Sequence, residues 1–220
     1  MSLRCITITC ITTPSVSYTT RLPLCTTTRA IFDPTGTYRY SLWREWCADS
    51  PPIAFIMLNP STADDQKDDP TIRRCIGFAH AWGFGALEVV NLFAYRATDS
   101  RKLLGVDDPV GSENDNYIVQ AVELCPFVVV AWGTKGVLLD SFSTLKRVVK
   151  GHCSCCPQRE SIPPKSEKGK CNCTRGRQVI RLLAGKRPIG CLGVTKDGHP
   201  RHPLYVRGNT KLQAFPILSK

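Results

Sequence analysis

Apolar runs of strand length alternate along the chain with segments in which apolar residues recur at helical spacing. We expect four buried strands from the apolar runs, over residues 53–58, 86–92, 127–132 and 189–194. Apolar positions that repeat every three or four residues predict helices over residues 70–82, 112–124, 136–149 and 177–184. This alternation predicts an α/β fold, namely a three-layer α/β/α sandwich around a central four-stranded parallel sheet.

Two local signals refine this outline. Asp69 precedes Pro70, and this pair predicts a helix start, because an Asp side chain can accept from the N–H groups of the first turn and Pro needs no donor there. Upstream, residues 35–43 are typical of a turn followed by a short strand.

Polar or turn-forming residues lie at or just after the end of each of the four predicted strands. They are Asn59-Pro60, Asn91, Trp132-Gly133 and the segment from Lys196 to His202. Because parallel α/β sheets bind ligands at the carboxyl ends of their strands, we expect these residues to meet at one edge. Pro60 biases Asn59 toward an extended backbone, which holds the Asn59 side chain in a defined direction at the strand tip.

Composition bounds the class of protein. The chain has 220 residues, 42% of them hydrophobic, which supports one domain with a substantial core over residues 29–220. A Thr-rich N-terminal extension over residues 1–28 precedes this domain, and a Cys-rich basic insert over residues 151–176 interrupts it. The formal net charge of +11 favours a polyanionic partner, with nucleic acid first and an anionic membrane second.

The sequence also lacks several familiar signals. No apolar run reaches the roughly 18 residues of a spanning helix, and Thr and Cys break up residues 1–13, which makes them a poor signal peptide. We therefore expect a cytoplasmic protein with no membrane partner. We also expect it to be a monomer. No Gly-rich dinucleotide fingerprint and no phosphate-binding loop follows any predicted strand, so no nucleotide cofactor is expected.

The insert raises the question of a metal. In a cytoplasmic protein, the twelve cysteines are expected to be thiols or metal ligands rather than disulfides. Four of them could supply the thiolates of a tetrahedral structural zinc site: Cys153, Cys156, Cys171 and Cys173. The second pair lacks the spacing of a standard zinc ribbon, so a basic loop with free thiols stays open as the other interpretation. No cofactor is expected for catalysis.

Three ordered motifs resemble the uracil-DNA glycosylase superfamily. Asn59-Pro60 resembles the first motif, which reads Gly-x-Asn-Pro-Gly in two branches. Asn91 resembles the Asn that reads the Watson–Crick edge of a flipped base. His202-Pro203, or alternatively His199-Pro200, resembles the late His-Pro-Ser motif. Some branches carry an iron–sulfur cluster, but the cysteine spacing here differs from theirs.

A longer pattern is similar to a prokaryotic and phage family of unknown function. It combines NPSTAD, NLFA, AWG and RHPLY, and it covers about residues 30–210 apart from the insert. The chain departs from the uracil pattern, because Ser61 replaces the Gly of the first motif and no Ser follows His202-Pro203. The resemblance therefore implies base excision without implying strict uracil specificity.

Base excision assigns a role to each candidate residue. A flipped base needs its Watson–Crick edge read in a pocket, and an Asn such as Asn91 offers both a donor and an acceptor. Asn59 would hold the attacking water, as the resemblance implies. Among the aspartates of residues 64–69, Asp64 is our choice to activate the water or to stabilise the oxocarbenium-like sugar. His202 would hydrogen-bond the departing base.

The remaining candidates would bind the base or the DNA backbone. Three residues near strand ends or in the His-Pro segment are further base-binding candidates: Phe93, Trp132 and His199. Four basic residues are candidates for phosphate contacts: Lys196, Arg201, Arg73 and Arg74. Each of these residues has an ordinary structural interpretation as well, as a core aromatic, a turn residue or a partner of the acidic loop.

The sequence thus predicts a monofunctional DNA glycosylase. No Lys stands in place for a Schiff base, so the expected product is an abasic site without strand cleavage. The departures from the uracil pattern favour a modified pyrimidine of phage-type DNA over plain uracil, with a role in phage defence or in repair. Two alternatives stay open: a hydrolase or transferase that acts on nucleotides or nucleosides, and a non-catalytic DNA-binding module.

Overall fold

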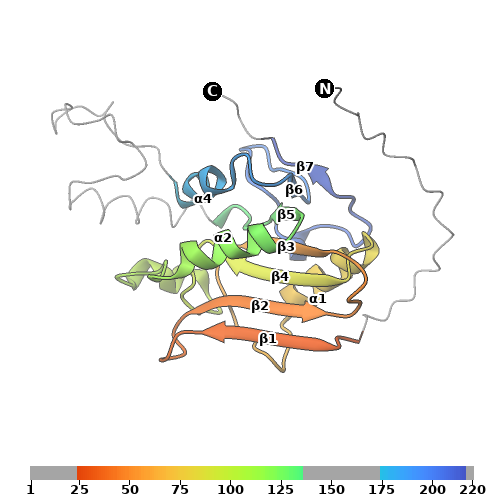
Figure 1. The fold of residues 1–220 in the computed structure, drawn as a ribbon. Coiled ribbons are helices and arrows are strands. Elements are labelled where there is room, and N and C mark those ends of the chain that lie inside the picture. The colour runs from red at the N-terminus through yellow and green to blue at the C-terminus, as the bar shows by residue number, and fades with distance from the viewer. Residues whose placement is uncertain (1–23, 136–173, 217–220) are drawn as a thin grey trace, which may run out of the picture.

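The structure, a computed structural model, describes residues 24–135 and 174–216. These residues form a seven-stranded sheet in the order β1-β2-β4-β3-β5-β6-β7, with β1 at one edge and β7 at the other (Figure 1). The strands are β1 Thr27–Phe32, β2 Arg39–Glu45, β3 Pro52–Met57, β4 Ala86–Asn91, β5 Phe127–Val130, β6 Ile189–Cys191 and β7 Gln213–Ala214. The helices are α1 Pro70–Ala81, α2 Asn114–Leu124 and α4 Arg175–Leu183, with two short 3₁₀ helices, η1 Ser100–Gly105 and η3 Pro203–Tyr205.

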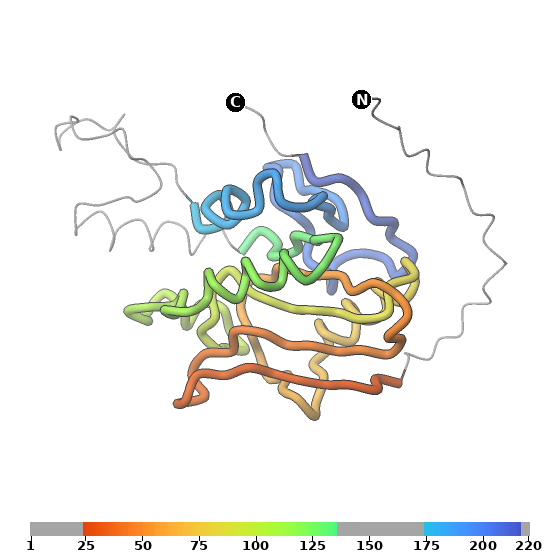
Figure 2. The backbone as a smooth tube through the Cα atoms, viewed as in Figure 1, coloured from red at the N-terminus to blue at the C-terminus, as the bar shows by residue number. Residues whose placement is uncertain are grey.

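The four predicted strands form the centre of this sheet. β3 runs parallel to both β4 and β5, and β5 runs parallel to β6, so their carboxyl ends lie at the same edge. The expected size of the sheet was wrong. β2 pairs antiparallel with β4, β1 with β2, and β7 with β6, which makes the sheet mixed. Figure 2 shows the outer segments at opposite sides of the fold, β1 and β2 in red to orange and β7 in violet-blue. These additions supply hydrogen-bond partners to backbone groups of β4 and β6 that would otherwise stand at open edges.

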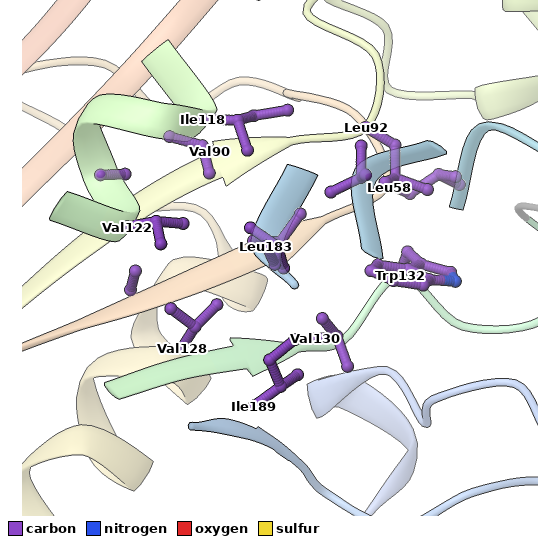
Figure 3. Close-up of a cluster of buried hydrophobic side chains, with 14 of the residues drawn as sticks. Leu58, Val90, Leu92, Ile118, Val122, Val128, Val130, Trp132, Leu183 and Ile189 are labelled. Carbon is purple, nitrogen blue, oxygen red and sulfur yellow. The ribbon is translucent and has the colours of Figure 1, made fainter. Parts of the chain in front are cut away.

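Helices cover both faces of the sheet, as the sequence predicts. Figure 3 shows one face, where Ile118 and Val122 of α2 and Leu183 of α4 pack with Val90 and Val128. The other face packs against α1 through a stripe at helical spacing, and these residues are Ile72, Cys75, Ile76 and Ala79. Each large aliphatic side chain buried in this way contributes about 1.5–3 kcal/mol to folding, which fixes the helices on the sheet.

Caps set the helix boundaries. Asp69 caps α1 as predicted, since its Oδ1 accepts from the Ile72 amide at 2.9 Å. α2 begins at Asn114, slightly after its predicted start, because the chain turns at Gly111 with a φ of +84°. α4 begins at Arg175, slightly before its predicted start, where the Thr174 hydroxyl accepts from the Arg177 amide at 3.2 Å.

Several predictions fall outside the part of the chain that the structure describes. They are the helix over residues 136–149, most of the 151–176 insert with its four candidate zinc ligands, and most of the N-terminal extension. The strand β1 begins at Thr27, at the end of that extension. Within the described ranges, no helix has the length and apolar character needed to cross a membrane.

Candidate functional site

A cavity of about 710 Å³ opens at the carboxyl edge of the parallel strands. All four strand tips contribute to its lining, and so does the start of α1. The contributing polar residues include Asn59 after β3, Asn91 at the end of β4, Thr134 after β5 and His202 after β6. The expected meeting of strand tips is therefore present as a single pocket.

Asn59 is fixed at the tip of β3 by two main-chain acceptors. Its Nδ2 donates to the Pro60 carbonyl at 2.9 Å and to the Ala97 carbonyl at 2.7 Å. Because the amide nitrogen is held by the backbone, the amide oxygen is the group left for a ligand. No donor from the described residues bonds to that Oδ1. Asn59 can thus offer a fixed hydrogen-bond acceptor to a water or substrate in the pocket.

Asn91 is buried at the last position of β4, with 1% of its surface exposed, and it lines the pocket. Its Oδ1 is buried and has no hydrogen-bond partner among the described residues. Leaving such an acceptor unsatisfied costs about 1–3 kcal/mol, so a ligand N–H that reached it would restore that energy. The backbone here is itself held rigidly, since Asn114 Nδ2 donates to the Asn91 carbonyl at 3.0 Å and to the Leu92 carbonyl at 3.1 Å.

His202 presents a neutral imidazole to the same pocket. Burial lowers the pKa of its ring to about 4, with the Lys135 charge acting in the same direction and the Asp69 charge opposing. Nδ1 accepts from the Leu204 amide at 3.3 Å, so the single proton of the neutral ring resides on Nε2. The ring is therefore an uncharged donor at neutral pH.

Close packing of the β5 loop positions His202. Gly133 has a φ of +74°, and a Cβ at that residue would lie 3.2 Å from the Cβ of His202. The Gly133 amide also donates to the Pro200 carbonyl at 3.0 Å. A side chain at Gly133 would therefore strain its own backbone and push His202 away.

Asp69 supplies the carboxylate of the pocket. It is buried, with 8% of its surface exposed, and it lines the cavity at the start of α1. One carboxylate oxygen caps the helix, which leaves the other able to meet a ligand. Its charge acts on two further pocket residues, because it raises the pKa of both Arg39 and His202 against the larger effect of burial.

Asp64, the carboxylate chosen from sequence, lies outside the pocket lining. Its Oδ1 accepts from the amides of Gln66 at 2.9 Å and Lys67 at 2.8 Å, and these bonds lower its pKa. The buried Arg44 anchors the rest of the acidic loop through the Asp64 carbonyl and through Asp68 at 2.8 Å. The geometry gives Asp64 a role in shaping this loop.

The other base-binding candidates separate into two groups. Trp132 lines the pocket beside Gly176, where an added Cβ would lie 3.2 Å from its ring. Phe93 is fully buried in the core on the α2 side, and His199 belongs to the turn after β6, so neither lines the pocket. Tyr205, which sequence reasoning missed, lines the pocket with 74% of its surface exposed.

Of the four candidates for phosphate contacts, one lines the pocket and three lie outside its lining. Arg201 lines the pocket, and its Nε donates to the Val194 carbonyl at 3.2 Å. Lys196 and Arg73 are exposed outside the lining. Arg74 is committed to the fold, because it donates to the carbonyls of Pro203 at 3.3 Å and Val206 at 2.5 Å and lies over the Phe78 ring.

Two basic residues of the pocket were not predicted. Arg39, at the start of β2, lines the cavity with only 2% of its surface exposed, and Lys135 lines it after β5. One feature of the sequence could have indicated a special role for Arg39, namely its position as a charged residue within a short strand rich in aromatic residues. Among the residues that the structure describes, no group of three or more His, Cys, Asp or Glu side chains is arranged to hold a metal ion.

Comparison with known proteins places the chain in a family. A family model described as "Protein of unknown function (DUF1643)" matches residues 39–165, which include Asn59, Asp69 and Asn91 of the pocket. No curated protein and no solved structure matches the chain. Since the match spans more than half of the 220 residues, the chain belongs to the DUF1643 family of proteins of unknown function.

Proposed function

We propose that this protein is a monofunctional DNA glycosylase, which flips a modified or damaged base out of DNA and hydrolyses its N-glycosidic bond. The observation that carries this proposal is that Asn59, Asn91 and His202 line one pocket. These residues come from the three motifs that resemble the uracil-DNA glycosylase superfamily. The parallel strands β4, β3, β5 and β6, with helices on both faces, form an α/β arrangement within a larger mixed sheet.

Asn91 would bind the flipped base. Its buried Oδ1 has no partner among the described residues, so an N–H on the Watson–Crick edge of a pyrimidine would satisfy it. Its Nδ2 could donate to a base carbonyl or ring nitrogen at the same time. Trp132 and Tyr205 would flank the base as aromatic surfaces, which tolerate different bases because every base has a π-face.

Asn59 and Asp69 would position and activate the water. The Asn59 Oδ1 would accept from the water, and the second carboxylate oxygen of Asp69 would take its proton as the C–O bond forms. The same negative charge would stabilise the oxocarbenium-like sugar. An amide alone is no base at neutral pH, so this scheme needs a carboxylate, and Asp69 takes the role that sequence reasoning gave to Asp64.

His202 would stabilise the departing base. Breaking the glycosidic bond leaves its electron pair on the base, and the developing negative charge spreads to the base oxygens. The neutral ring carries its proton on Nε2 and would donate a hydrogen bond there. A fixed donor in a partly buried site is an effective way to stabilise such a charge.

The size of the pocket bears on the substrate. A volume of about 710 Å³ lies in the range of pockets that enclose drug-sized ligands, which are larger than a bare pyrimidine ring. This favours a pyrimidine with a substituent, such as those of phage DNA, over uracil. Excision of such a base would serve phage defence, whereas excision of a damaged base would serve repair.

The same volume favours one alternative, a hydrolase or transferase that acts on free nucleotides or nucleosides, because the pocket could take a whole nucleotide. One assay separates the two functions. The protein is incubated with uracil-containing DNA, hypermodified phage DNA and the matching free nucleotides, and released bases are measured by mass spectrometry. Release from DNA supports the glycosylase. Release from free nucleotides alone supports the alternative, and salt-sensitive DNA binding without release supports a non-catalytic module.

A further inference from the structure

Arg39 is a buried cation whose hydrogen-bonding capacity is largely unused by the protein. β2 runs antiparallel to β4, so its first residue lies beside the carboxyl end of β4, where the Arg39 amide donates to the Ala94 carbonyl at 3.0 Å. The side chain has 2% of its surface exposed and lines the pocket. Nη1 donates to the Ala63 carbonyl at 2.8 Å, whereas the buried Nε has no partner among the described residues.

The surroundings of Arg39 leave its charge incompletely compensated. Burial lowers its pKa to about 10, and the nearby Arg96 and Arg44 act in the same direction. Asp69 and, more weakly, Asp64 oppose them, but within the described ranges no carboxylate comes within 4.0 Å of the Arg39 guanidinium. Arg44 differs, because it has an ion pair of its own with Asp68. A buried cation without a paired anion is costly, and a bound anion would remove that cost.

We propose that Arg39 forms an oxyanion subsite in this pocket and binds a carboxylate or phosphate group of the ligand. A guanidinium presents a planar fork of donors that matches two oxygens of one such group. The pocket favours an anion overall, since Lys135 and Arg201 also line it and Asp69 is its one acidic side chain among the described residues. This inference concerns binding and goes beyond the proposed function, because it holds even if the pocket cleaves nothing.

Two sources can present the same oxyanion, and two pairs of probes distinguish them. Uracil and 5-carboxyuracil differ by a carboxylate on the base. Deoxyuridine and deoxyuridine 5′-monophosphate differ by the phosphate of a nucleotide. Binding is measured by isothermal titration calorimetry in a phosphate-free buffer of low ionic strength. In the wild-type protein, at least one anionic probe should bind about tenfold or more tightly than its neutral counterpart, as expected for charge-assisted hydrogen bonds.

Variants assign this preference to Arg39. Arg39→Met should abolish the difference between anionic and neutral probes, and Arg39→Lys should reduce it while keeping the charge. Arg29→Met is the matched control, because it removes one positive charge from an exposed position on β1 and should keep the difference. Circular dichroism checks folding, and if the Met variant does not fold, the Lys variant decides. The proposal is overturned if neither anionic probe is preferred by the wild type, or if the folded Arg39 variants keep the full preference.

Discussion

Asp69 and His202 line the same pocket, and the charge of Asp69 opposes the burial that keeps the His202 ring neutral. The two residues belong to segments far apart in the chain. Asp69 immediately precedes α1, and His202 immediately precedes η3. Arg74 of α1 joins these segments by donating to the Pro203 and Val206 carbonyls. The fold thereby places a carboxylate and an uncharged imidazole donor in the lining of one pocket.

Asp69→Asn should lower base release by about 100-fold or more, because the variant lacks the carboxylate that would take the proton of the water. It should keep the helix cap, because Asn is also a good N-cap residue. Asp64→Asn is the matched control, and it should retain activity because Asp64 lies outside the pocket lining. Initial rates of base release measure both variants. The reverse order, with Asp64→Asn inactive and Asp69→Asn active, would return the catalytic role to the acidic loop.

The depressed pKa of His202 predicts an unusual pH dependence. The neutral ring is the active donor, so base release should show no loss attributable to this residue near the ordinary His pKa of about 6.5, and a loss only as pH falls through about 4. Histidine signals in two-dimensional NMR give the pKa directly, and Asp69→Asn should lower it further because a favourable negative charge is removed. An inflection near pH 6.5 that disappears in His202→Gln would contradict this account.

Glu88 should make the protein less stable as the pH rises from about 4.5 to about 7. It is buried on β4, and burial raises its pKa to about 7, against the opposing effects of Ser41 and Arg29. Between its unfolded pKa of about 4.5 and this value, the folded state holds a proton that the unfolded state releases, so stability falls as pH rises through that window. Glu88→Gln should add up to about 3 kcal/mol of stability at pH 8 and little at pH 4.

Urea denaturation of the wild type and of Glu88→Gln at both pH values tests this prediction. Ser41 can still donate to the amide oxygen that the substitution introduces, so the variant keeps the main contact of the wild-type side chain. Parallel pH profiles for the two proteins would show that folding does not raise the pKa of Glu88, which would contradict the prediction.

Asn114 should stabilise the end of β4, which carries Asn91. It is fully buried, and Asn114→Ala removes donors from the Asn91 and Leu92 carbonyls, which should cost about 2–3 kcal/mol of unfolding free energy. Asn116→Ala is the matched control on the same helix, and its exposed side chain should contribute under about 0.5 kcal/mol. Equal losses in the two variants, measured by urea denaturation, would contradict the role of Asn114.

Much of the central fold could be predicted from the sequence, because the period of the apolar positions and the length of the apolar runs indicate which residues are buried. Apolar runs located β3, β4, β5 and β6, and Asp69-Pro70 located the start of α1. The outer strands were harder to predict, since β7 has two residues and the first half of β1 is polar. Such strands are defined by the edges that they cover rather than by their own composition.

The same limit applies to the pocket. Asn59, Asn91 and His202 could be predicted because they lie at or after the ends of strands, and these ends meet at one edge. Asp69 was recognised as a cap, but a cap and a pocket carboxylate look identical in sequence. Phe93 lies only two residues beyond Asn91 yet is fully buried in the core, and the direction of a side chain after a strand ends is set by loop contacts that no periodicity reports.

The most direct test of the central claim is release of base from DNA by the wild type and by Asn59→Ala. Hypermodified phage DNA and uracil-containing DNA are incubated with each protein, freed base is measured by mass spectrometry, and abasic sites are counted with an aldehyde-reactive probe. We expect equal amounts of freed base and abasic sites with the wild type, and a loss of about 100-fold or more with Asn59→Ala. No release from any DNA, or undiminished release by Asn59→Ala, would contradict the central claim.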